Sequence, residues 1–452
     1  MSEIQKLPSD RKAIPEMLHN GGITYRLSLL IMGFANLAHR QICKGLLFLA
    51  AEIAFVFWMA VTGWKNIRDF FTLGTHVQGW QFDEELGINI LQEGDNSMIL
   101  MIYGIATVAV AVIFGIFYYV NLKSAAHLYL LEKNGKKIPS FGEELGELLD
   151  ERFHVTLLTV PVGGVLVFTV LPLVYMILLA FTSYDHNHIP PKSLFDWVGL
   201  ENFGNIFTGR MSGTFLPLLG WTVVWAVFAT VTTFFFGVLL ALLINTKGVK
   251  GKKIFRTLFV LTMAMPQFIS LLLMQNLLHA SGPVNSMLMS IGLIDSPLPF
   301  LTDGLWAKVS IIFGNMWIGI PVTMLVSTGI IMNLPEDQIE AARMDGAGSF
   351  QIFRRITFPQ ILFVMAPTLI QQFIGNINNF KVIYLLTGGG PYNSNYYSAG
   401  ETDLLVTWLY KLTVEAADYN LAAAIGIITF VLSAVISLFA YTRTNAYKGG
   451  DM

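Results

Sequence analysis

Apolar and polar positions alternate along this chain in long blocks. Eight blocks each hold roughly 20 mostly apolar residues, and charged residues or clusters of Gly, Pro and Asn bound them. They cover residues 45–63, 98–120, 156–182, 217–245, 257–279, 307–332, 362–385 and 418–441. Because a helix needs about 20 apolar residues to cross a hydrocarbon core of about 30 Å, the pattern predicts an all-α membrane protein with eight transmembrane helices.

The fifth, sixth and seventh blocks contain residues that interrupt helices. Pro266, Pro321 and Gly375 fall inside them, together with several Asn residues. Inside a membrane, such breaks are tolerated where neighbouring helices or a watery cavity satisfy the freed backbone groups. We therefore expect broken helices at these positions.

Lys and Arg gather on one side of the predicted spans. If the spans alternate in direction, 21 of the 28 Lys and Arg residues share one side, in segments 1–44, 121–155, 246–256, 333–361 and 442–452. Cytoplasmic loops carry an excess of these residues. Both termini are therefore expected in the cytoplasm, with a short cytoplasmic tail at 446–452.

Two cytoplasmic segments flank the first two spans, which lie within residues 45–155. In the N-terminal segment 1–44, Leu27–Ala38 is apolar but too short to span. It is either a helix along the inner membrane surface or part of a partly disordered leader. Segment 121–155 mixes Lys with Glu and Asp, which predicts a solvated helical hairpin acting as a linker or, less simply, as a regulatory site.

Composition excludes several classes of protein. The 452 residues are 54% hydrophobic and 13% charged, about half the charged fraction of a soluble protein. A formal charge of −2 leaves no basic face for nucleic acid. Cys43 is the only cysteine, which excludes disulfide frameworks and cysteine-based metal sites. The first long apolar run begins near Gly45, too deep for a cleavable signal peptide, so it is expected to stay in the membrane.

Segment 333–361, between the sixth and seventh spans, has the signals of a helix–turn–helix. Asn333 can cap a helix, and Pro335 suits a first helical turn, where its missing N–H costs nothing. Two acidic residues follow, where the helix dipole favours negative charge. Gly346 can adopt the left-handed conformation that ends a helix.

A second short helix is expected after this glycine. Ser349 can cap it, Arg354 and Arg355 would point to water, and Pro359 would end it. A plain cytoplasmic connector would explain these charges and caps. It does not explain the small pair Ala341-Ala342 beside a glutamate, which lets another protein's backbone come close and offers it a carboxylate.

This loop resembles the EAA loop of ABC importer permeases. The family spacing is Glu-Ala-Ala-x3-Gly-x9-Ile-x-Leu-Pro, and residues 340–359 match it with Phe358 in place of the Leu. The resemblance implies a coupling helix that seats in a groove on a separate ATPase subunit. The residues that it carries over are Glu340, Ala341, Ala342, Asp345, Gly346, Ile356 and Pro359.

From about residue 156 to 444 the chain also resembles the maltose/maltodextrin permease subunit of the MalF type. The supporting segments are 314–321 (GNMWIGIP), 378–380 (NNF), 386–391 (LTGGGP) and 419–424 (YNLAAA). The resemblance implies a type I ABC importer permease, with a six-helix core at 156–445 that includes the loop. Enterobacterial members carry a large external insertion that this chain lacks, so it is more similar to the shorter Gram-positive relatives.

The family resemblance also implies partners and a location. We expect a second permease subunit of the MalG type, an ABC ATPase dimer that holds ATP and Mg, and an extracellular sugar-binding lipoprotein, in the plasma membrane of a bacterium. The chain itself is expected to bind no cofactor, metal or nucleic acid and to be no enzyme. Malto-oligosaccharides are the expected substrate, moved by alternating access, with galacto-oligosaccharides or cyclodextrins as alternatives.

A sugar site inside a membrane needs hydroxyl and amide partners and an apolar face for stacking. Gln267, Asn315, Trp317 and the Asn residues within 376–379 are candidates, because amides match sugar hydroxyls without adding charge. The same amides could instead join helices or mend breaks. Three Asn residues next to Gly375 favour a functional role.

The resemblance implies a fuller set of sugar contacts. The matching positions are Met263, Gln267, Asn315, Ile318, Gly319, Val322, Gly375, Asn376 and Asn379. At Met263, Gln267, Val322 and Gly375 the residues of the maltose-type site are absent, which weakens the case for maltose itself. Smaller side chains there could leave room for a longer or different oligosaccharide.

Segment 386–390 (LTGGG) superficially resembles the ATP-sensing signature of ABC ATPases. The predicted topology puts it at the outer end of the seventh span, and the chain has no G-x4-G-K-[ST] phosphate loop. We therefore expect a tight turn that ends the span, and no ATP hydrolysis by this chain.

Two other classes fit less well. A proton- or sodium-driven transporter usually carries ionisable residues within its spans. The third to eighth predicted spans hold no Asp or Glu, only Lys308 near an end and Lys381, while Glu52 lies near the cytoplasmic end of the first span. A membrane-embedded enzyme would need a nucleophile, a base or metal ligands, but the eight His residues lie scattered in or beside loops.

Overall fold

The computed structural model describes residues 13–84, 87–151, 153–246 and 250–443. The predicted tail at 446–452 and the first twelve residues of the N-terminal segment lie outside the described residues. The chain forms two compact units. The first holds residues up to Leu178 together with Thr182–Trp197, and the second holds Leu179–Phe181 and everything from Val198 onward.

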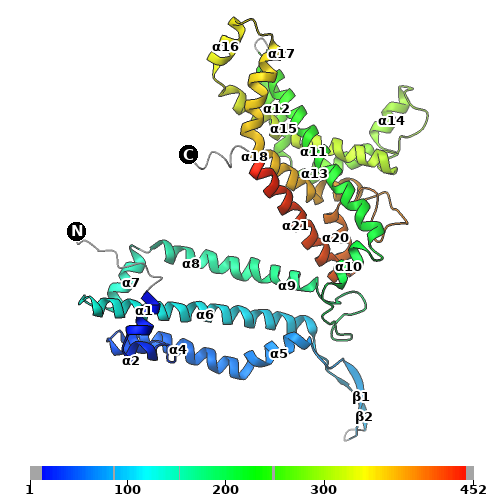
Figure 1. The fold of residues 1–452 in the computed structure, drawn as a ribbon. Coiled ribbons are helices and arrows are strands. Elements are labelled where there is room, and N and C mark those ends of the chain that lie inside the picture. Colours follow the sequence, from blue (N-terminus) through cyan, green and yellow to red (C-terminus); the bar gives the residue numbers. More distant parts are fainter. Residues whose placement is uncertain (1–12, 85–86, 152, 247–249, 444–452) are drawn as a thin grey trace. The chain divides into compact units, whose positions relative to one another are not determined.

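The first unit is mostly helical, with one small sheet (Figure 1). Its elements, with π-helical turns written η, are α1 (Ala13–Asn20), α2 (Ile23–Leu27), α3 (Phe34–Ala38), α4 (Ile42–Trp58), η1 (Met59–Gly63), α5 (Trp64–Thr72), β1 (Gly79–Asp83), β2 (Ile88–Gln92), α6 (Ser97–Lys133), α7 (Phe141–Leu149), α8 (Phe153–Val165), η2 (Leu166–Val170) and α9 (Leu171–Leu179).

Two long helices lie side by side in this unit (Figure 1). One is the continuous helix α4–η1–α5, and the other is α6. Phe55 stacks on Phe114 with ring centroids 3.8 Å apart. Gly104 faces the Phe70 ring so closely that an added Cβ would lie 2.3 Å from it, so only glycine permits this approach.

The N-terminal helices α1 to α3 pack on the end of α6. Met17, Tyr25 and Ala35 are buried there against Ala125 and Leu128. Polar contacts fix the same surface: the Gly33 N–H donates to Asn121 Oδ1 over 2.8 Å, and Asn36 Nδ2 donates to Ser124 Oγ over 2.9 Å. From Ala13 onward the segment is therefore folded, which contradicts the alternative of a partly disordered leader for these residues.

A two-stranded antiparallel hairpin departs from the all-α expectation. Strands β1 and β2 pair Trp80 with Leu91 and Phe82 with Asn89. The hairpin was not predicted, because its apolar residues lie outside the eight apolar blocks. Segment 121–155 is helical on both sides of a turn at Asn134–Gly135, since α6 continues to Lys133 and α7 follows.

The second unit contains only helices among its described elements (Figure 1). They are α10 (Glu201–Phe207), α11 (Ser212–Asn245), α12 (Lys252–Ala264), α13 (Gln267–Leu278), α14 (Pro283–Ser290), α15 (Gly304–Met332), α16 (Glu336–Met344), α17 (Ser349–Ile352), η3 (Phe353–Thr357), α18 (Phe358–Ile377), α19 (Phe380–Thr387), α20 (Leu405–Val414) and α21 (Tyr419–Arg443).

Helices α11 and α15 form the centre of this unit. Small residues let them approach closely: a Cβ on Gly319 would lie 2.5 Å from Thr233 Cγ2, and one on Gly237 would lie 2.5 Å from Thr323 Cβ. Trp225 and Ile311 are fully buried in the core beside them. This pair provides a rigid wall against which α18 and α19 pack.

The spans agree with the prediction in number and differ in detail. Seven described helices are long and apolar enough to cross a membrane, or eight if the bent pair α12 with α13–α14 is one span. That pair bends by 96° at the break that holds Pro266, as expected. The predicted break at Pro321 is wrong, because α15 runs through it and packs on α11 along its length. Gly375 lies inside α18, and the helix is interrupted at Asn378 instead.

Candidate coupling loop and transport pocket

Helix α16 and the turn after it form the first half of the predicted coupling loop. The helix begins one residue after Pro335, which is the N-cap, so the prediction that Asn333 caps it is wrong. Asn333 instead ends α15, and its amide donates to the Gly329 carbonyl over 2.8 Å. The rest of the turn matches the expectation for Gly346.

Gly346 adopts a left-handed conformation, with φ of 81°. Its N–H donates to the Arg343 carbonyl over 3.0 Å, and the Ala347 N–H donates to the Ala342 carbonyl over 2.9 Å. These two hydrogen bonds are the Schellman pattern, which satisfies the last carbonyls of a helix. The turn that orients α16 therefore depends on a backbone conformation that glycine adopts at least cost.

The second half of the loop is the beginning of a span. Helix α17 starts after Gly348, not at a Ser349 cap, and Gln351 Oε1 accepts the Gly348 N–H over 3.0 Å. The predicted stop at Pro359 is also wrong, because Ser349–Ile377 is one continuous helix. Pro359 follows the π-helical turn η3 by two residues, just as Pro172 follows η2. A π turn shifts the backbone bonds from i−4 to i−5, which helps the helix to accommodate a residue without an N–H.

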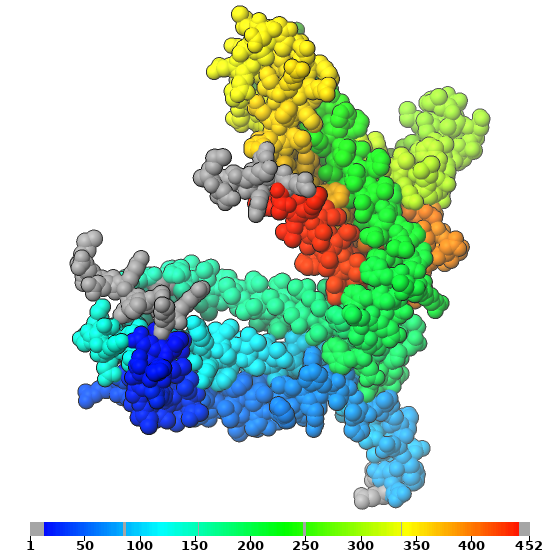
Figure 2. Space-filling model, viewed as in Figure 1, coloured from blue at the N-terminus to red at the C-terminus, as the bar shows by residue number. Residues whose placement is uncertain are grey.

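The loop presents its side chains to the outside of the unit. Figure 2 shows it in yellow at the free end of this unit. Glu340, Ala341 and Asp345 are exposed, and the apolar side chains of Met344 and Phe350 are 87% and 72% exposed. Single exposed apolar residues are ordinary, but this one loop exposes two large apolar residues as well as Ala341. Of the remaining predicted residues, Ala342 and Ile356 are half-buried and Pro359 is exposed.

A pocket with a volume of about 490 Å³ opens in the second unit between α11, α15, α18 and α19. The break at Pro266 brings Gln267, the first residue of α13, to the same pocket. Eight of the nine predicted sugar contacts line it: Gln267, Asn315, Ile318, Gly319, Val322, Gly375, Asn376 and Asn379. Residues far apart in the sequence are therefore gathered around one cavity.

Met263, the ninth predicted residue, lines a neighbouring pocket of about 140 Å³. The two pockets share Gln267, Ile318 and Val322, and Trp317 lines the smaller one. Trp317 is half exposed, so its ring offers a flat apolar face. The pair of pockets thus combines amides with an aromatic surface, which are the two requirements for a sugar site.

The pocket amides also bond to one another. Asn379 Nδ2 lies 3.2 Å from Asn315 Oδ1 and 3.3 Å from Asn376 Oδ1. Asn376 Nδ2 donates to Thr230 Oγ1 over 3.0 Å, which joins α18 to α11. Asn379 Oδ1 accepts the Val382 N–H over 3.2 Å and so caps α19. These amides join helices and mend a break, while the exposed Gln267 side chain contributes a polar group to the pocket wall.

Four lining residues were not predicted as contacts: Thr233, Gln372, Phe380 and Lys381. Gln372 lies one helical turn before Asn376, so the spacing of four residues was a usable signal. Lys381 stood out in the sequence only as a cation within a span. Thr233 had no such signal, because nothing in its apolar surroundings marks the face of α11 that reaches the pocket.

The glycines of segment 386–390 form the tight turn that was expected. Gly388 and Gly389 have φ angles of 60° and 82° directly after α19. A Cβ on Gly389 would lie 1.9 Å from Asp403 Oδ1, so this position requires glycine for space as well. The turn therefore packs directly against the segment around Asp403, which leads into α20.

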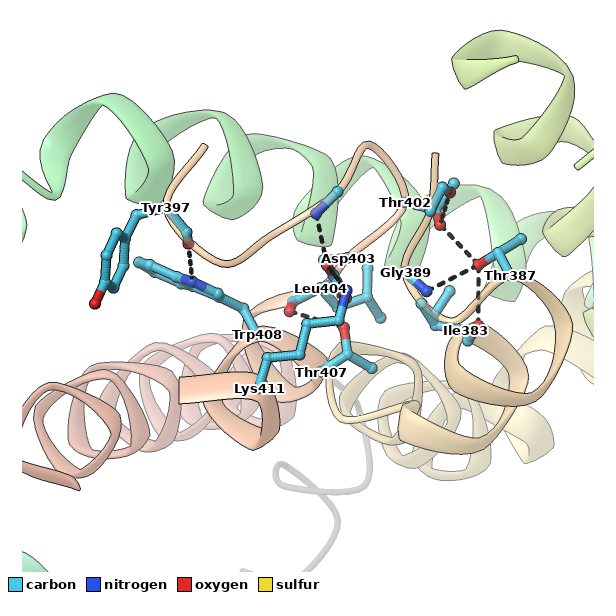
Figure 3. A network of polar contacts seen from close by, with 12 residues as sticks. Ile383, Thr387, Gly389, Tyr397, Thr402, Asp403, Leu404, Thr407, Trp408 and Lys411 are labelled. Carbon is cyan, nitrogen blue, oxygen red and sulfur yellow. Dashed lines mark hydrogen bonds and ion pairs between the residues drawn. The ribbon is translucent and has the colours of Figure 1, made fainter. Parts of the chain in front are cut away.

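Asp403 is completely buried beside this turn. Figure 3 shows Lys411 reaching from α20 to its carboxylate, with Nζ 2.6 Å from Oδ2. In the same network Thr387 and Thr402 share a hydrogen bond of 2.8 Å, and Trp408 Nε1 donates to the Tyr397 carbonyl over 2.8 Å. The network fixes α20 against the C-terminal end of α19. The pocket residues Asn379 and Lys381 lie at the opposite end of the same helix, as its N-cap and in its first turn.

Comparison with known proteins shows which family has this architecture. Residues 233–443 match the family of binding-protein-dependent transport system inner membrane components. The galactooligosaccharides transport system permease protein GanP of Bacillus subtilis is 36% identical over 93% of this chain and 97% of its own. The maltodextrin transport system permease protein MdxF of the same organism is 35% identical over 94% and 96%.

A solved structure shares the fold. A chain of a bacterial alginate ABC transporter, in complex with an alginate pentasaccharide-bound periplasmic protein, has 27% identity and a TM-score of 0.54, covering 66% of this chain and 98% of that one. Together with the apolar helices, these likenesses confirm the resemblance inferred from the sequence. The chain is a multi-pass membrane protein of the binding-protein-dependent transport system inner membrane component family, whose members are the permease subunits of ABC importers.

Proposed function

We propose that this chain forms part of the translocation path of an oligosaccharide importer in the plasma membrane of a bacterium, with malto-oligosaccharides as cargo. The observation that carries the proposal is the pocket itself, where eight of the nine residues implied by the family resemblance line one cavity. Their amides and the nearby Trp317 suit a hydroxyl-rich ligand. The similarity to MdxF supports the choice of sugar.

Galacto-oligosaccharides are the second candidate. GanP and MdxF are 36% and 35% identical to this chain, and their names give different sugars. The pocket wall is open at Gly375, where an added Cβ would meet no atom within 4 Å, so nothing at this position excludes galacto-oligosaccharides.

The loop of α16 and α17 is proposed to seat on a separate ABC ATPase dimer, which would bind ATP and Mg. Its exposed Glu340, Ala341 and Met344 supply a carboxylate, a small residue and an apolar residue for that contact. A second permease of the MalG type would complete the pore, and an extracellular lipoprotein would deliver the sugar. The Lys and Arg distribution supports cytoplasmic termini, which puts the loop on the ATPase side.

Closure of the ATPase would reach the pocket through a single helix. The helix Ser349–Ile377 begins in the loop and ends with Gly375 and Asn376 in the pocket wall. At 1.5 Å per residue it spans about 40 Å. Any displacement of the loop therefore moves one wall of the pocket, provided that ATP binding favours one conformer over the other.

The test is ATP hydrolysis by the reconstituted complex, with its binding protein, across maltotriose, longer maltodextrins and galacto-oligosaccharides. Stimulation by malto-oligosaccharides alone is expected. Stimulation by galacto-oligosaccharides alone would keep the importer and replace the substrate. No response to any sugar, with the chain still bound to its ATPase, would contradict sugar transport.

A further inference from the structure

Lys381 is the one charged residue among the thirteen that line the transport pocket. It lies in the first turn of α19, two residues after Asn379, and its side chain is exposed. Lysines in the membrane-embedded part of a transporter usually face a cavity and serve transport, and Lys381 lines a cavity four residues after the span that ends at Ile377. The charge therefore calls for a function beyond the neutral amides around it.

The other lysines of this unit's α15 and α20 have carboxylate partners. Lys308 Nζ lies 3.1 Å from Glu401, and Lys411 Nζ lies 2.6 Å from Asp403. Lys381 has no ion pair or hydrogen bond through its ammonium group with any residue that the structure describes. Its charge is thus not used to hold the fold together within the described chain.

The pocket offers no anion to neutralise this charge. The other lining residues are uncharged, and the amide groups of Asn315, Asn376 and Asn379 are occupied with one another and with threonines. Gln372 Oε1 is buried without a hydrogen-bond partner in the described residues. An ammonium group without a carboxylate partner attracts an anion, and more strongly where the walls of a pocket exclude water.

We propose that Lys381 extends the cargo of the pocket from neutral malto-oligosaccharides to those that carry a carboxylate or another anionic group, which it would bind more tightly. The inference rests on the proposed transport function. A charge-assisted hydrogen bond is about twice as strong as a neutral one, so a preference of roughly tenfold is expected. The exposed Gln267 amide and Gln372 Oε1, which has no partner among the described residues, would hold hydroxyls of the same ligand.

The experiment compares two ligands that differ in one group. Maltotriitol and maltotrionate both have an opened reducing end, with a hydroxymethyl group in the first and a carboxylate in the second. Their dissociation constants are measured on the purified complex of this chain with the second permease and the ATPase, without binding protein. The variants are Lys381→Gln, Lys381→Glu and the control Lys65→Gln, which removes an exposed lysine of α5 outside the pocket.

The wild type and Lys65→Gln should bind maltotrionate roughly tenfold more tightly than maltotriitol. Lys381→Gln should remove the preference, and Lys381→Glu should reverse it. Equal binding in the wild type, or a ratio unchanged in Lys381→Gln, overturns the proposal. If Lys381→Gln impairs assembly of the complex, and the assembled fraction keeps the wild-type ratio of dissociation constants, Lys381 contacts the second permease and not the ligand.

The same complex separates this proposal from the function on which it rests. Suppose that maltotriose stimulates ATP hydrolysis in the presence of the binding protein, but the ratio of the two dissociation constants is the same with and without Lys381. Only the specificity role of Lys381 then fails. If no sugar binds and none stimulates hydrolysis, the proposed function fails with it.

Discussion

The side-chain amide of Gln360, in α18, donates a hydrogen bond of 2.9 Å to Gln338 Oε1, in α16. It joins the exposed helix of the loop directly to the span that ends at the pocket. A neutral bond on the surface adds little to stability, about 0.5–1.5 kcal/mol. Its position suggests a larger effect on coupling.

Replacing Gln360 with Ala should lower sugar uptake per ATP hydrolysed about two- to fivefold, because α16 could then shift without the span. The measurement is the ratio of uptake to hydrolysis in proteoliposomes. Gln371→Ala, at an exposed position of the same helix, is the control and should keep the wild-type ratio. An unchanged ratio in Gln360→Ala would remove this bond from the coupling path.

Gly346→Ala should cost about 1 kcal/mol locally, because its φ of 81° is unfavourable for a residue with a Cβ. Gly346→Pro should abolish uptake, since it also removes the N–H that bonds to Arg343. Both proteins should still reach the membrane. Gly348→Ala is the matched control, because Gly348 has φ of −70° and an added Cβ would meet only Gln351 Oε1, at 4.0 Å.

Glu340→Lys should abolish uptake with little effect on the amount of protein in the membrane. The side chain is exposed, so the substitution reverses a charge on the proposed docking surface without burying it. Uptake and membrane level are measured in the same cells. Normal uptake would contradict the coupling assignment of α16.

Asn379→Ala should raise the half-saturating sugar concentration several-fold and leave assembly with the ATPase intact. It removes an amide that lies between Asn315 and Asn376. Asn376→Ala should do the same at some cost in stability, because the buried Thr230 hydroxyl loses its partner. Asn276→Ala is the control, since Asn276 is exposed in α13, its amide donates to the Leu272 carbonyl of the same helix, and it lines neither pocket. If all three variants saturate like the wild type, the amides are purely structural.

The start of α7 should become less stable in acid. Glu143 accepts the Ser140 N–H over 2.7 Å and pairs with Lys137 at 2.9 Å, and these contacts lower its pKa to about 2. Because the folded pKa is below its ordinary value of 4.5, the stabilisation is complete above about pH 4.5 and is lost as the pH falls toward 2. Hydrogen exchange in the first turn of α7, corrected for intrinsic rates, should show this loss. Glu143→Gln should abolish the pH dependence, and a persistent dependence would assign it to another group.

Sequence reasoning located the pocket because polar residues are rare in apolar blocks. Asn315 and Asn376 stand out for that reason, and the resemblance supplied positions such as Gly319 that have no polar signal. It could not show that the amides bond to each other, because this depends on how α11, α15 and α18 cross. Thr233 shows the same limit, since threonine is common in apolar helices.

Helix ends were predicted less well than helices. Asn333 and Pro335 are both acceptable helix starts, and only the preceding helix, which uses Asn333 for its own end, decides between them. Pro359 normally ends a helix, but the π turn before it lets the helix continue. The helix α15 continues through Pro321 because it packs on α11, and this packing cannot be predicted from the local sequence.

That π turn has a consequence for helical register. A π turn holds one residue more than an α turn, so everything after η3 is rotated by about 100° relative to an unbroken α-helix. Gly375 and Asn376 lie on the pocket side of α18 with this rotation included. If η3 became an ordinary α turn with no residue removed, both residues would turn about 100° away from the cavity, whereas deleting one residue between Phe353 and Thr357 would remove the π turn and leave them facing it. The loop and the pocket are therefore matched in angular phase as well as in distance.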